Sequence, residues 1–170
     1  MHLRYAVTDD YDLLVQLVVE AVNWTGQTRL DRAAVLALPE LSHYITGWKR
    51  PTDFGLVAVD GDGAPLGAIW ARSFSAADPG YGFISADVPE LSMAVLPGGR
   101  GRGLGSALLR ACVAQARELG VAALSLSVED GNARARALYD ASQFRVVGRN
   151  GASHTMRLDL VARAAATGST

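Results

Sequence analysis

The chain has 170 residues, of which 49% are hydrophobic, and its 16 basic and 17 acidic side chains give a net charge of −1. This length and composition predict one globular domain with a sizeable core and exclude a largely disordered chain. Because the charge is close to zero, no global field draws the chain toward nucleic acid or an anionic membrane, and we expect neither as a partner.

The sequence also limits the compartment and the metal chemistry. The N-terminal Met-His-Leu-Arg-Tyr lacks the apolar region of a signal peptide, and no apolar run approaches the roughly 20 residues that cross a bilayer. We therefore expect a soluble cytoplasmic protein. The only cysteine, Cys112, excludes an intrachain disulfide and is expected in the core. Three scattered histidines (His2, His43 and His154) offer no ligand spacing, so we expect no metal.

The first part of the chain predicts a strand followed by helices. Residues 2–7 alternate apolar and polar side chains like an edge strand, and Thr8-Asp9-Asp10 begins a helix that runs to about Val22. The inward positions of this helix are predicted to be Leu13, Leu14, Leu17, Val18 and Ala21. A second helix begins near residue 30 or 31, is interrupted by Pro39 and continues through Tyr44.

A hairpin and a long loop follow. Residues 54–59 and 66–71 are predicted strands joined by Asp60-Gly61-Asp62-Gly63, a strong hairpin signal. Residues 72–89 are too many for a tight turn, and loops of this length are often functional. Aromatic side chains of this first half could line a pocket for a substrate, although core packing is the more common role: Trp24, Tyr44, Trp48, Trp70, Phe74 and Tyr81.

The second half predicts alternating strands and helices. A short apolar strand opened by Glu90 ends at Pro97, and a glycine-rich loop leads into a helix that ends at Gly120. Residues 122–128 form the next strand, and the order strand, helix, strand implies parallel pairing. A helix through Ala141 and two strands, 144–148 and 154–160, close a domain of residues 1–160. Residues 161–170 are expected to be a flexible tail.

The glycine-rich loop predicts an anion site. It joins a strand to a helix N-terminus, where unpaired backbone N–H groups and the helix dipole favour a phosphate. Glycines at 98, 99, 101, 103 and 105 allow close approach of the backbone. Arg100 and Arg102 are predicted to add charge-assisted hydrogen bonds to the same anion.

Two common phosphate-binding loops do not fit this segment. No register satisfies Gly-x-Gly-x-x-Gly, and a Walker loop requires a lysine that the segment lacks. Residues 100–105, Arg-Gly-Arg-Gly-Leu-Gly, do fit Arg/Gln-x-x-Gly-x-Gly/Ala between a strand and a helix. This pattern resembles the acyl-CoA pyrophosphate loop of the GNAT superfamily of N-acetyltransferases. The alternatives are a glycine-rich surface loop and an Arg-Gly segment that binds RNA.

A second motif strengthens the resemblance. Residues 132–139, Asn-Ala-Arg-Ala-Arg-Ala-Leu-Tyr, resemble the GNAT element Asn-x-x-Ala-x-x-x-Tyr and begin 27 residues after Gly105. Taken alone, Asn132 would be a helix N-cap and Tyr139 a core residue. The family often ends this element with Gly-Phe, whereas this chain has Gln143-Phe144, so we expect Gln143 to adopt a left-handed conformation.

The resemblance implies a fold and a cofactor site. It implies a single α/β (α+β) domain with a mixed, mostly antiparallel sheet, a central parallel strand pair splayed around the acyl-CoA, and helices on both faces. The pyrophosphate of acetyl-CoA would bind the loop, and the pantetheine would run along residues 93–95. The implied cofactor-binding residues are Met93, Ala94, Val95, Arg100, Gly101, Arg102, Gly103, Leu104, Gly105, Ser106 and Asn132.

The resemblance also implies a reaction. A primary amine of a small molecule or peptide would attack acetyl-CoA directly in a ternary complex. Tyr139 would protonate the departing thiolate. As the base that accepts the amine proton we choose Glu90, which opens the strand before the glycine-rich loop, with Asp87 as second choice; the alternative is that Glu90 is only a solvated residue at a strand start. An acyl-CoA-binding regulatory module with little turnover is the alternative, and whether the chain forms a homodimer stays open.

Overall fold

The computed structural model describes residues 1–160, and the predicted C-terminal tail lies outside the described residues. The first strand is β1 (His2–Tyr5), and a 3-10 turn (Thr8–Asp10) leads into α1 (Tyr11–Val22). The short helices α2 (Arg32–Ala37) and α3 (Pro39–Ser42) follow. Asp31 caps α2 by accepting a 2.8 Å hydrogen bond from the N–H of Ala34, as expected for a helix start at this position.

The remaining elements build most of the sheet. The hairpin strands are β2 (Phe54–Val59) and β3 (Pro65–Arg72), and β4 (Glu90–Val95) precedes the glycine loop. The second half contains α4 (Leu104–Glu118), β5 (Ala123–Glu129), α5 (Ala133–Ala141), β6 (Arg145–Asn150) and β7 (Ser153–Asp159). The predicted left-handed conformation of Gln143 is confirmed, since its φ is 67°.

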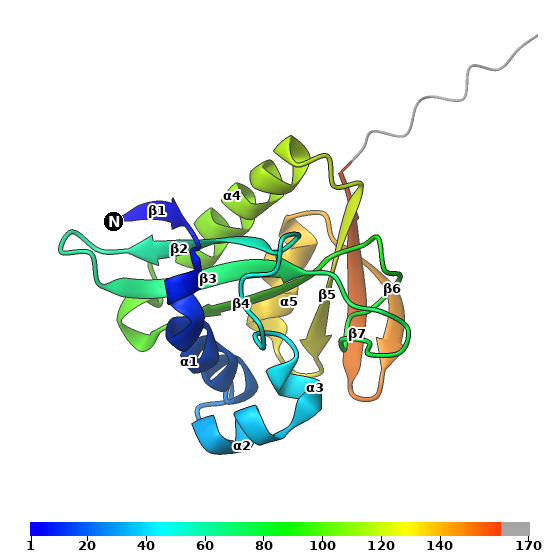
Figure 1. Cartoon of the computed structure of the whole chain (residues 1–170), viewed down its shortest axis with the longest axis horizontal. Helices are drawn as coiled ribbons and strands as arrows, with labels where there is room; N and C mark the ends of the chain where they lie inside the picture. Colours follow the sequence, from blue (N-terminus) through cyan, green and yellow to red (C-terminus); the bar gives the residue numbers. More distant parts are fainter. Residues whose placement is uncertain (161–170) are drawn as a thin grey trace, which may run out of the picture.

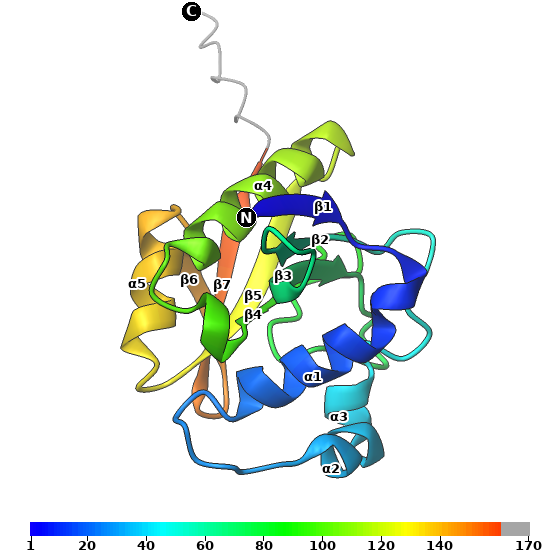
Figure 2. The ribbon, with the colours of Figure 1, turned by 90° about the vertical axis from the view of Figure 1, so that its left-hand side faces the viewer.

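Seven strands form one sheet in the order β1-β2-β3-β4-β5-β7-β6. Every neighbouring pair is antiparallel except β4 and β5, so the predicted mixed sheet with a central parallel pair is confirmed. Helices α4 and α5 cover one face, and α1, α2 and α3 cover the other (Figures 1 and 2). We refer to these as the α4 face and the α1 face.

Strands β4 and β5 separate soon after they meet. Only Glu90 and Ser125 are paired between them, whereas β3 and β4 pair along six positions. Beyond this single pair the two strands diverge, which leaves a gap in the middle of the sheet. The gap connects the α1 face with the α4 face at the strand that leads into the glycine loop.

Helix α1 shows one error in the predicted pattern. Leu14, Leu17 and Val18 are buried as expected, and Val15 is buried in addition. Ala21, predicted to point inward, is exposed because the last turn of α1 faces an open cavity rather than the core.

Candidate active site

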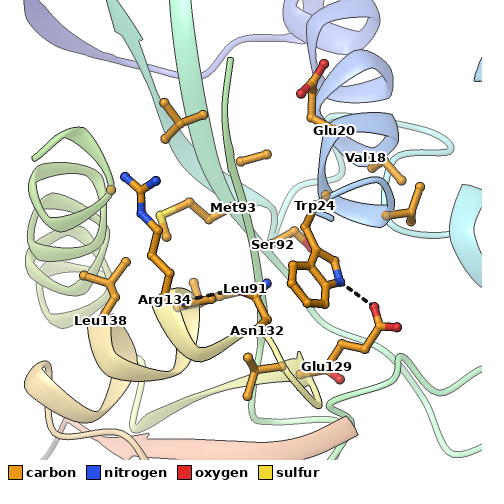
Figure 3. Close-up of a pocket in the computed structure, with 18 of the residues that line it drawn as sticks. Val18, Glu20, Trp24, Leu91, Ser92, Met93, Glu129, Asn132, Arg134 and Leu138 are labelled. Carbon is orange, nitrogen blue, oxygen red and sulfur yellow. Dashed lines mark hydrogen bonds between the residues drawn. The ribbon is translucent and has the colours of Figure 1, made fainter. Parts of the chain in front are cut away.

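A cavity of about 990 Å³ occupies the gap between β4 and β5. Its walls come from the end of α1, the loop that follows it, β4, the glycine loop, the end of β5, the start of α5 and the β6–β7 turn. Figure 3 shows side chains of both faces turned toward it, with Trp24 on one side and Leu138 on the other. The cavity is therefore open to groups from both faces of the sheet.

One end of the cavity is the predicted anion site. Gly103 has a φ of 71° and forms the N-cap of α4. The first-turn N–H groups of residues 104–106 have no backbone partner among the described residues, as geometry requires at a helix start. Gly101, Gly103, Leu104, Gly105 and Ser106 all line the cavity. Several free donors and the positive end of the helix dipole thus meet at one place.

The two arginines predicted to assist this site behave differently. Arg100 lines the cavity, but its Nε donates to the carbonyl of Val95 at 3.2 Å, and its guanidinium pairs with Glu20 at 2.8 Å. Arg102 is exposed and does not line the cavity. Arg134 of α5, which was not singled out from the sequence, lines the cavity and forms no ion pair within residues 1–160 (Figure 3).

The edge of β4 offers free backbone groups. The N–H of Leu96 donates to the carbonyl of Leu66 in β3 at 2.8 Å, which fixes the alternation along β4. Backbone groups of Met93 and Val95 therefore point away from β3, toward the gap, where β5 is no longer paired. The Arg100 contact with the Val95 carbonyl agrees with this direction. An extended ligand with amide groups could pair with this edge.

Glu90 lies on the α1 face at the closed end of the gap. It is only 2% exposed, and its Oε1 accepts hydrogen bonds from the Tyr44 hydroxyl at 2.7 Å and the Gly82 N–H at 2.9 Å. Its Oε2 is buried without a partner within the described chain. Burial raises the pKa of Glu90 to about 7, against the two hydrogen bonds, which favour the charged form. A carboxylate with such a pKa is suited to accept a proton near neutral pH.

Tyr139 reaches the same cavity from the α4 face. Its ring belongs to the core beneath α4 and packs against Phe144 with 5.9 Å between centroids. Its hydroxyl has no hydrogen-bond partner among residues 1–160, and the residue lines the cavity. Burial raises the pKa of Tyr139 to about 12, so the hydroxyl keeps its proton at neutral pH.

Asn132 acts as the N-cap of α5, the role expected for it if it is read apart from the motif. Its side-chain oxygen accepts a 3.2 Å hydrogen bond from the N–H of Ala135 and caps α5. The residue also lines the cavity.

The loop after α1 is fastened to the end of β5. Trp24 Nε1 donates to Glu129 at 2.7 Å, and Arg29 pairs with the same carboxylate at 3.0 Å. Asn23 holds the loop together by accepting from the N–H groups of Arg29 and Leu30. These contacts place an aromatic wall over the α1 side of the cavity (Figure 3).

Most predicted site residues lie together. Glu90, Tyr139 and all the predicted cofactor-binding residues except Arg102 line the cavity. Asp87, the second candidate for the base, is exposed, bonds to Ser85, and does not line the cavity. Among the predicted pocket aromatics, Trp24, Tyr44, Trp70 and Tyr81 line the cavity, whereas Trp48 and Phe74 are core residues.

Sequence reasoning missed Glu20, Arg134 and the serines Ser92 and Ser127, all of which line the cavity. Arg134 follows Asn132 by two positions and was within the recognised motif. Glu20 carries no local signal, because its role depends on an arginine 80 residues away.

Within residues 1–160, no group of three or more acidic, histidine or cysteine side chains is arranged to hold a metal ion. The described helices are also too short or too polar to span a bilayer. Cys112 is buried, as predicted, and burial raises the pKa of its thiol to about 12.

Comparison with known proteins identifies a matching family. The model of the acetyltransferase (GNAT) family matches residues 19–144. A mycothiol acetyltransferase from Beutenbergia cavernae is 40% identical over 100 residues, which make up 59% of this chain. The matched region is only 31% of that longer protein.

Solved structures show the same fold. A GNAT superfamily phosphinothricin acetyltransferase from Sinorhizobium meliloti, in complex with AcCoA, has a TM-score of 0.69 at 23% identity, covering 99% of this chain and 92% of that one. A ribosomal-protein-alanine N-acetyltransferase from Brucella melitensis has a TM-score of 0.66 at 23% identity, covering 94% of this chain and 99% of that one.

Proposed function

The chain belongs to the acetyltransferase (GNAT) family, and from that premise we propose that it transfers the acetyl group of acetyl-CoA to a primary amine of a small molecule or peptide. The amine attacks directly, with both substrates bound in one ternary complex. The observation that carries the proposal is the placement of Glu90 and Tyr139, which reach one cavity from opposite faces of the sheet through the gap between β4 and β5.

The free groups of the cavity match the parts of acetyl-CoA. The N–H groups of residues 104–106 receive the pyrophosphate, and Arg134 adds positive charge beside them. The backbone edge of Met93 and Val95 pairs with the amides of the pantetheine. A backbone N–H at this edge also faces the thioester oxygen and stabilises the negative charge that develops there during attack.

The reaction then needs two proton transfers. A protonated amine cannot attack, and a lysine-like amine has a pKa near ~10.4, so Glu90 accepts its proton, directly or through water. The new C–N bond forms as the C–S bond breaks. Tyr139 gives its proton to the departing thiolate of CoA and regains one from solvent. Holding amine and thioester together supplies the rest of the acceleration.

The test is to incubate the protein with acetyl-CoA and a panel of primary amines, and to measure free CoA thiol together with the mass of the acetylated product. Intersecting initial-rate lines are expected for a ternary complex. Binding of acetyl-CoA with no thiol release for any amine would instead support an acyl-CoA-binding regulatory module. Absence of acetyl-CoA binding would overturn both.

A further inference from the structure

The two faces of the gap differ sharply in polarity. Side chains alternate along a strand, so Leu124, Leu126 and Val128 of β5 join the core on the α4 face. The intervening positions of β5 and the matching positions of β4 point to the α1 face, because Glu90 meets Tyr44 and Glu129 meets Trp24 there. We call these α1-face residues the polar strip: Glu90, Ser92, Ser125, Ser127 and Glu129.

The loop between β3 and β4 covers the polar strip at Glu90 and Ser125. Gly82 lies so close to β5 that an added Cβ would be 2.5 Å from the carbonyl carbon of Leu126, and a Cβ on Gly80 would be 2.1 Å from Oε2 of Glu90. Ser125 is consequently fully buried. Two residues further along each strand, the polar strip becomes accessible at Ser92 of β4 and Ser127 of β5, which both line the cavity.

The accessible hydroxyls are free to bind a ligand. Neither Ser92 nor Ser127 makes a side-chain hydrogen bond within the part of the chain that the structure describes, and both are only half-buried. They lie next to Glu90 along the strands, so a molecule whose amine reaches the base passes over them. A hydroxyl or amide group on such a molecule would find a hydrogen-bonding partner at this place.

Among residues 1–160, no cation on the α1 side is free to bind an anionic group. Three arginines line the cavity: Arg29, Arg100 and Arg134. Arg29 is paired with Glu129, and the other two lie at the phosphate end, by the glycine loop and on α5. Near the base, the charged groups are therefore the carboxylate of Glu90 and the Arg29–Glu129 pair. A carboxylate or phosphate on the acceptor would be repelled by Glu90 without compensation.

From these features we propose that the acceptor is a small primary amine that carries hydroxyl or amide groups and no anionic group, bound by the hydroxyls of Ser127 and Ser92. An amino alcohol, an amino sugar and an amino-acid amide share this chemistry. Trp24 and Tyr44 enclose the apolar atoms of the same molecule. This inference rests on the proposed acetyl transfer and specifies its acceptor.

Matched pairs of amines test the inference. Ethanolamine is compared with propylamine, glucosamine with cyclohexylamine, and glycinamide with glycine, each at saturating acetyl-CoA. The rates are corrected for the fraction of neutral amine, because the members of a pair differ in pKa. In each pair we expect kcat/KM to be at least about tenfold higher for the first member, since a site built to bind a polar group rejects the analogue that lacks it.

Ser127→Ala tests the residue itself. It should bring the ethanolamine-to-propylamine ratio of kcat/KM close to one while leaving the KM of acetyl-CoA unchanged. Ser85→Ala is the matched control, because Ser85 bonds to Asp87 outside the cavity, and it should keep the parent ratio. Ser92→Ala provides a second variant if Ser127→Ala does not fold, and it should reduce the same ratio.

The outcomes separate this inference from the proposed function. Equal or higher rates for propylamine, cyclohexylamine and glycine would overturn the inference while acetyl transfer to amines stands. A ratio unchanged in both serine variants would overturn the role of these hydroxyls. If no amine releases CoA, the proposed function fails and the inference falls with it.

Discussion

The hydroxyl of Tyr44 donates a 2.7 Å hydrogen bond to Oε1 of Glu90, the carboxylate that we propose as the base. This contact favours the charged form of Glu90 and opposes the burial that raises its pKa to about 7. Tyr44 is itself buried, and this burial is the largest cause that holds its pKa well above the usual value; the negative charge of Glu90 is the second cause. The phenol therefore keeps its proton and continues to donate. We therefore expect the Tyr44 hydrogen bond to influence the pH at which Glu90 accepts a proton.

Removing this hydrogen bond should shift the pH profile. In Tyr44→Phe the charged form of Glu90 loses a donor, so the pKa of Glu90 rises and the acid limb of kcat moves to higher pH. Below the limb, activity falls about tenfold for each unit of the shift. The measurement is kcat against pH at saturating substrates. Tyr5→Phe, at an exposed position outside the cavity, should keep the parent profile. An unmoved limb in Tyr44→Phe would show that another group is titrating.

The raised pKa of Glu90 also has a cost in stability. Between the usual glutamate pKa and about 7, the unfolded chain loses this proton while the folded chain keeps it, so the free energy of unfolding falls as pH rises through that window. The loss is on the order of 3 kcal/mol and is complete above pH 7. Glu90→Gln removes the titration, so it should gain stability relative to the parent at pH 8 but not at pH 4.

Urea unfolding of both proteins at the two pH values measures this difference. A relative stability of Glu90→Gln that is the same at pH 4 and pH 8 would contradict the raised pKa. In the same variant, kcat at pH 7.5 should drop by about 10²-fold or more because the base is absent, while the affinity for acetyl-CoA is kept.

What the sequence could predict is the part of the site that local chain geometry determines. The glycine loop, the left-handed Gln143 and the cap glycine Gly120 each follow from backbone demands of a few neighbouring residues, and the structure confirms the last two by φ angles of 67° and 73°. The predicted parallel pairing of β4 and β5 was also correct, because a helix between two strands returns the chain to the end of the sheet where the first strand began, so both strands run in the same direction.

The rest depends on contacts between distant residues. Tyr44 and Glu90 are 46 positions apart, and Glu20 and Arg100 are 80 apart, so no local pattern indicates either pair. Arg100 and Arg102 look equivalent in the sequence, yet only Arg100 lines the cavity, because the turn of the loop directs Arg102 to solvent. Side-chain direction in an irregular loop has no periodicity from which to predict it.

Substitution at Gly103 should separate cofactor binding from the fold. Gly103→Val places a branched side chain at a φ of 71°, which costs about 1–2 kcal/mol of stability, and it also disturbs the N–H groups of the first turn of α4. We expect acetyl-CoA affinity to fall about 10- to 100-fold, which corresponds to the loss of one or two charge-assisted hydrogen bonds. Calorimetric titration with acetyl-CoA measures it.

Gly98→Ala is the matched control in the same loop. A Cβ added at Gly98 would meet no atom within 4 Å and the residue has no positive φ, so the variant should bind like the parent. Parent-like binding by Gly103→Val would mean that the loop does not hold the pyrophosphate.

The ion pair between Glu20 and Arg100 should compete with the cofactor. Both side chains line the cavity, and Glu20 places a negative charge where phosphates are proposed to bind. The pair is partly exposed, so it breaks at little cost. Glu20→Gln releases Arg100 and should tighten acetyl-CoA binding about 3- to 10-fold at low salt, with a smaller effect at high salt. Glu118→Gln, on the solvent side of α4, should change nothing. Weaker binding by Glu20→Gln would show that Glu20 orients Arg100 for the ligand.

For Tyr139, a purely structural role and a catalytic role predict opposite effects of Tyr139→Phe on turnover. Tyr139→Phe keeps the ring and its packing against Phe144, and it removes only a hydroxyl that has no hydrogen-bond partner within residues 1–160. The fold and the affinity for acetyl-CoA should therefore be unchanged.

If the hydroxyl protonates the thiolate, kcat should fall at least about tenfold. Solvent water can also protonate a thiolate, whose pKa is only ~8.5, so the loss should lie near the lower end of what removing a general acid causes. Burial raises the pKa of Tyr139 to about 12, so the hydroxyl keeps its proton at moderately alkaline pH. The loss in the variant should be largest below the thiol pKa of ~8.5, where the departing thiolate must take up a proton. Turnover within twofold of the parent across the pH range would assign Tyr139 to the core alone.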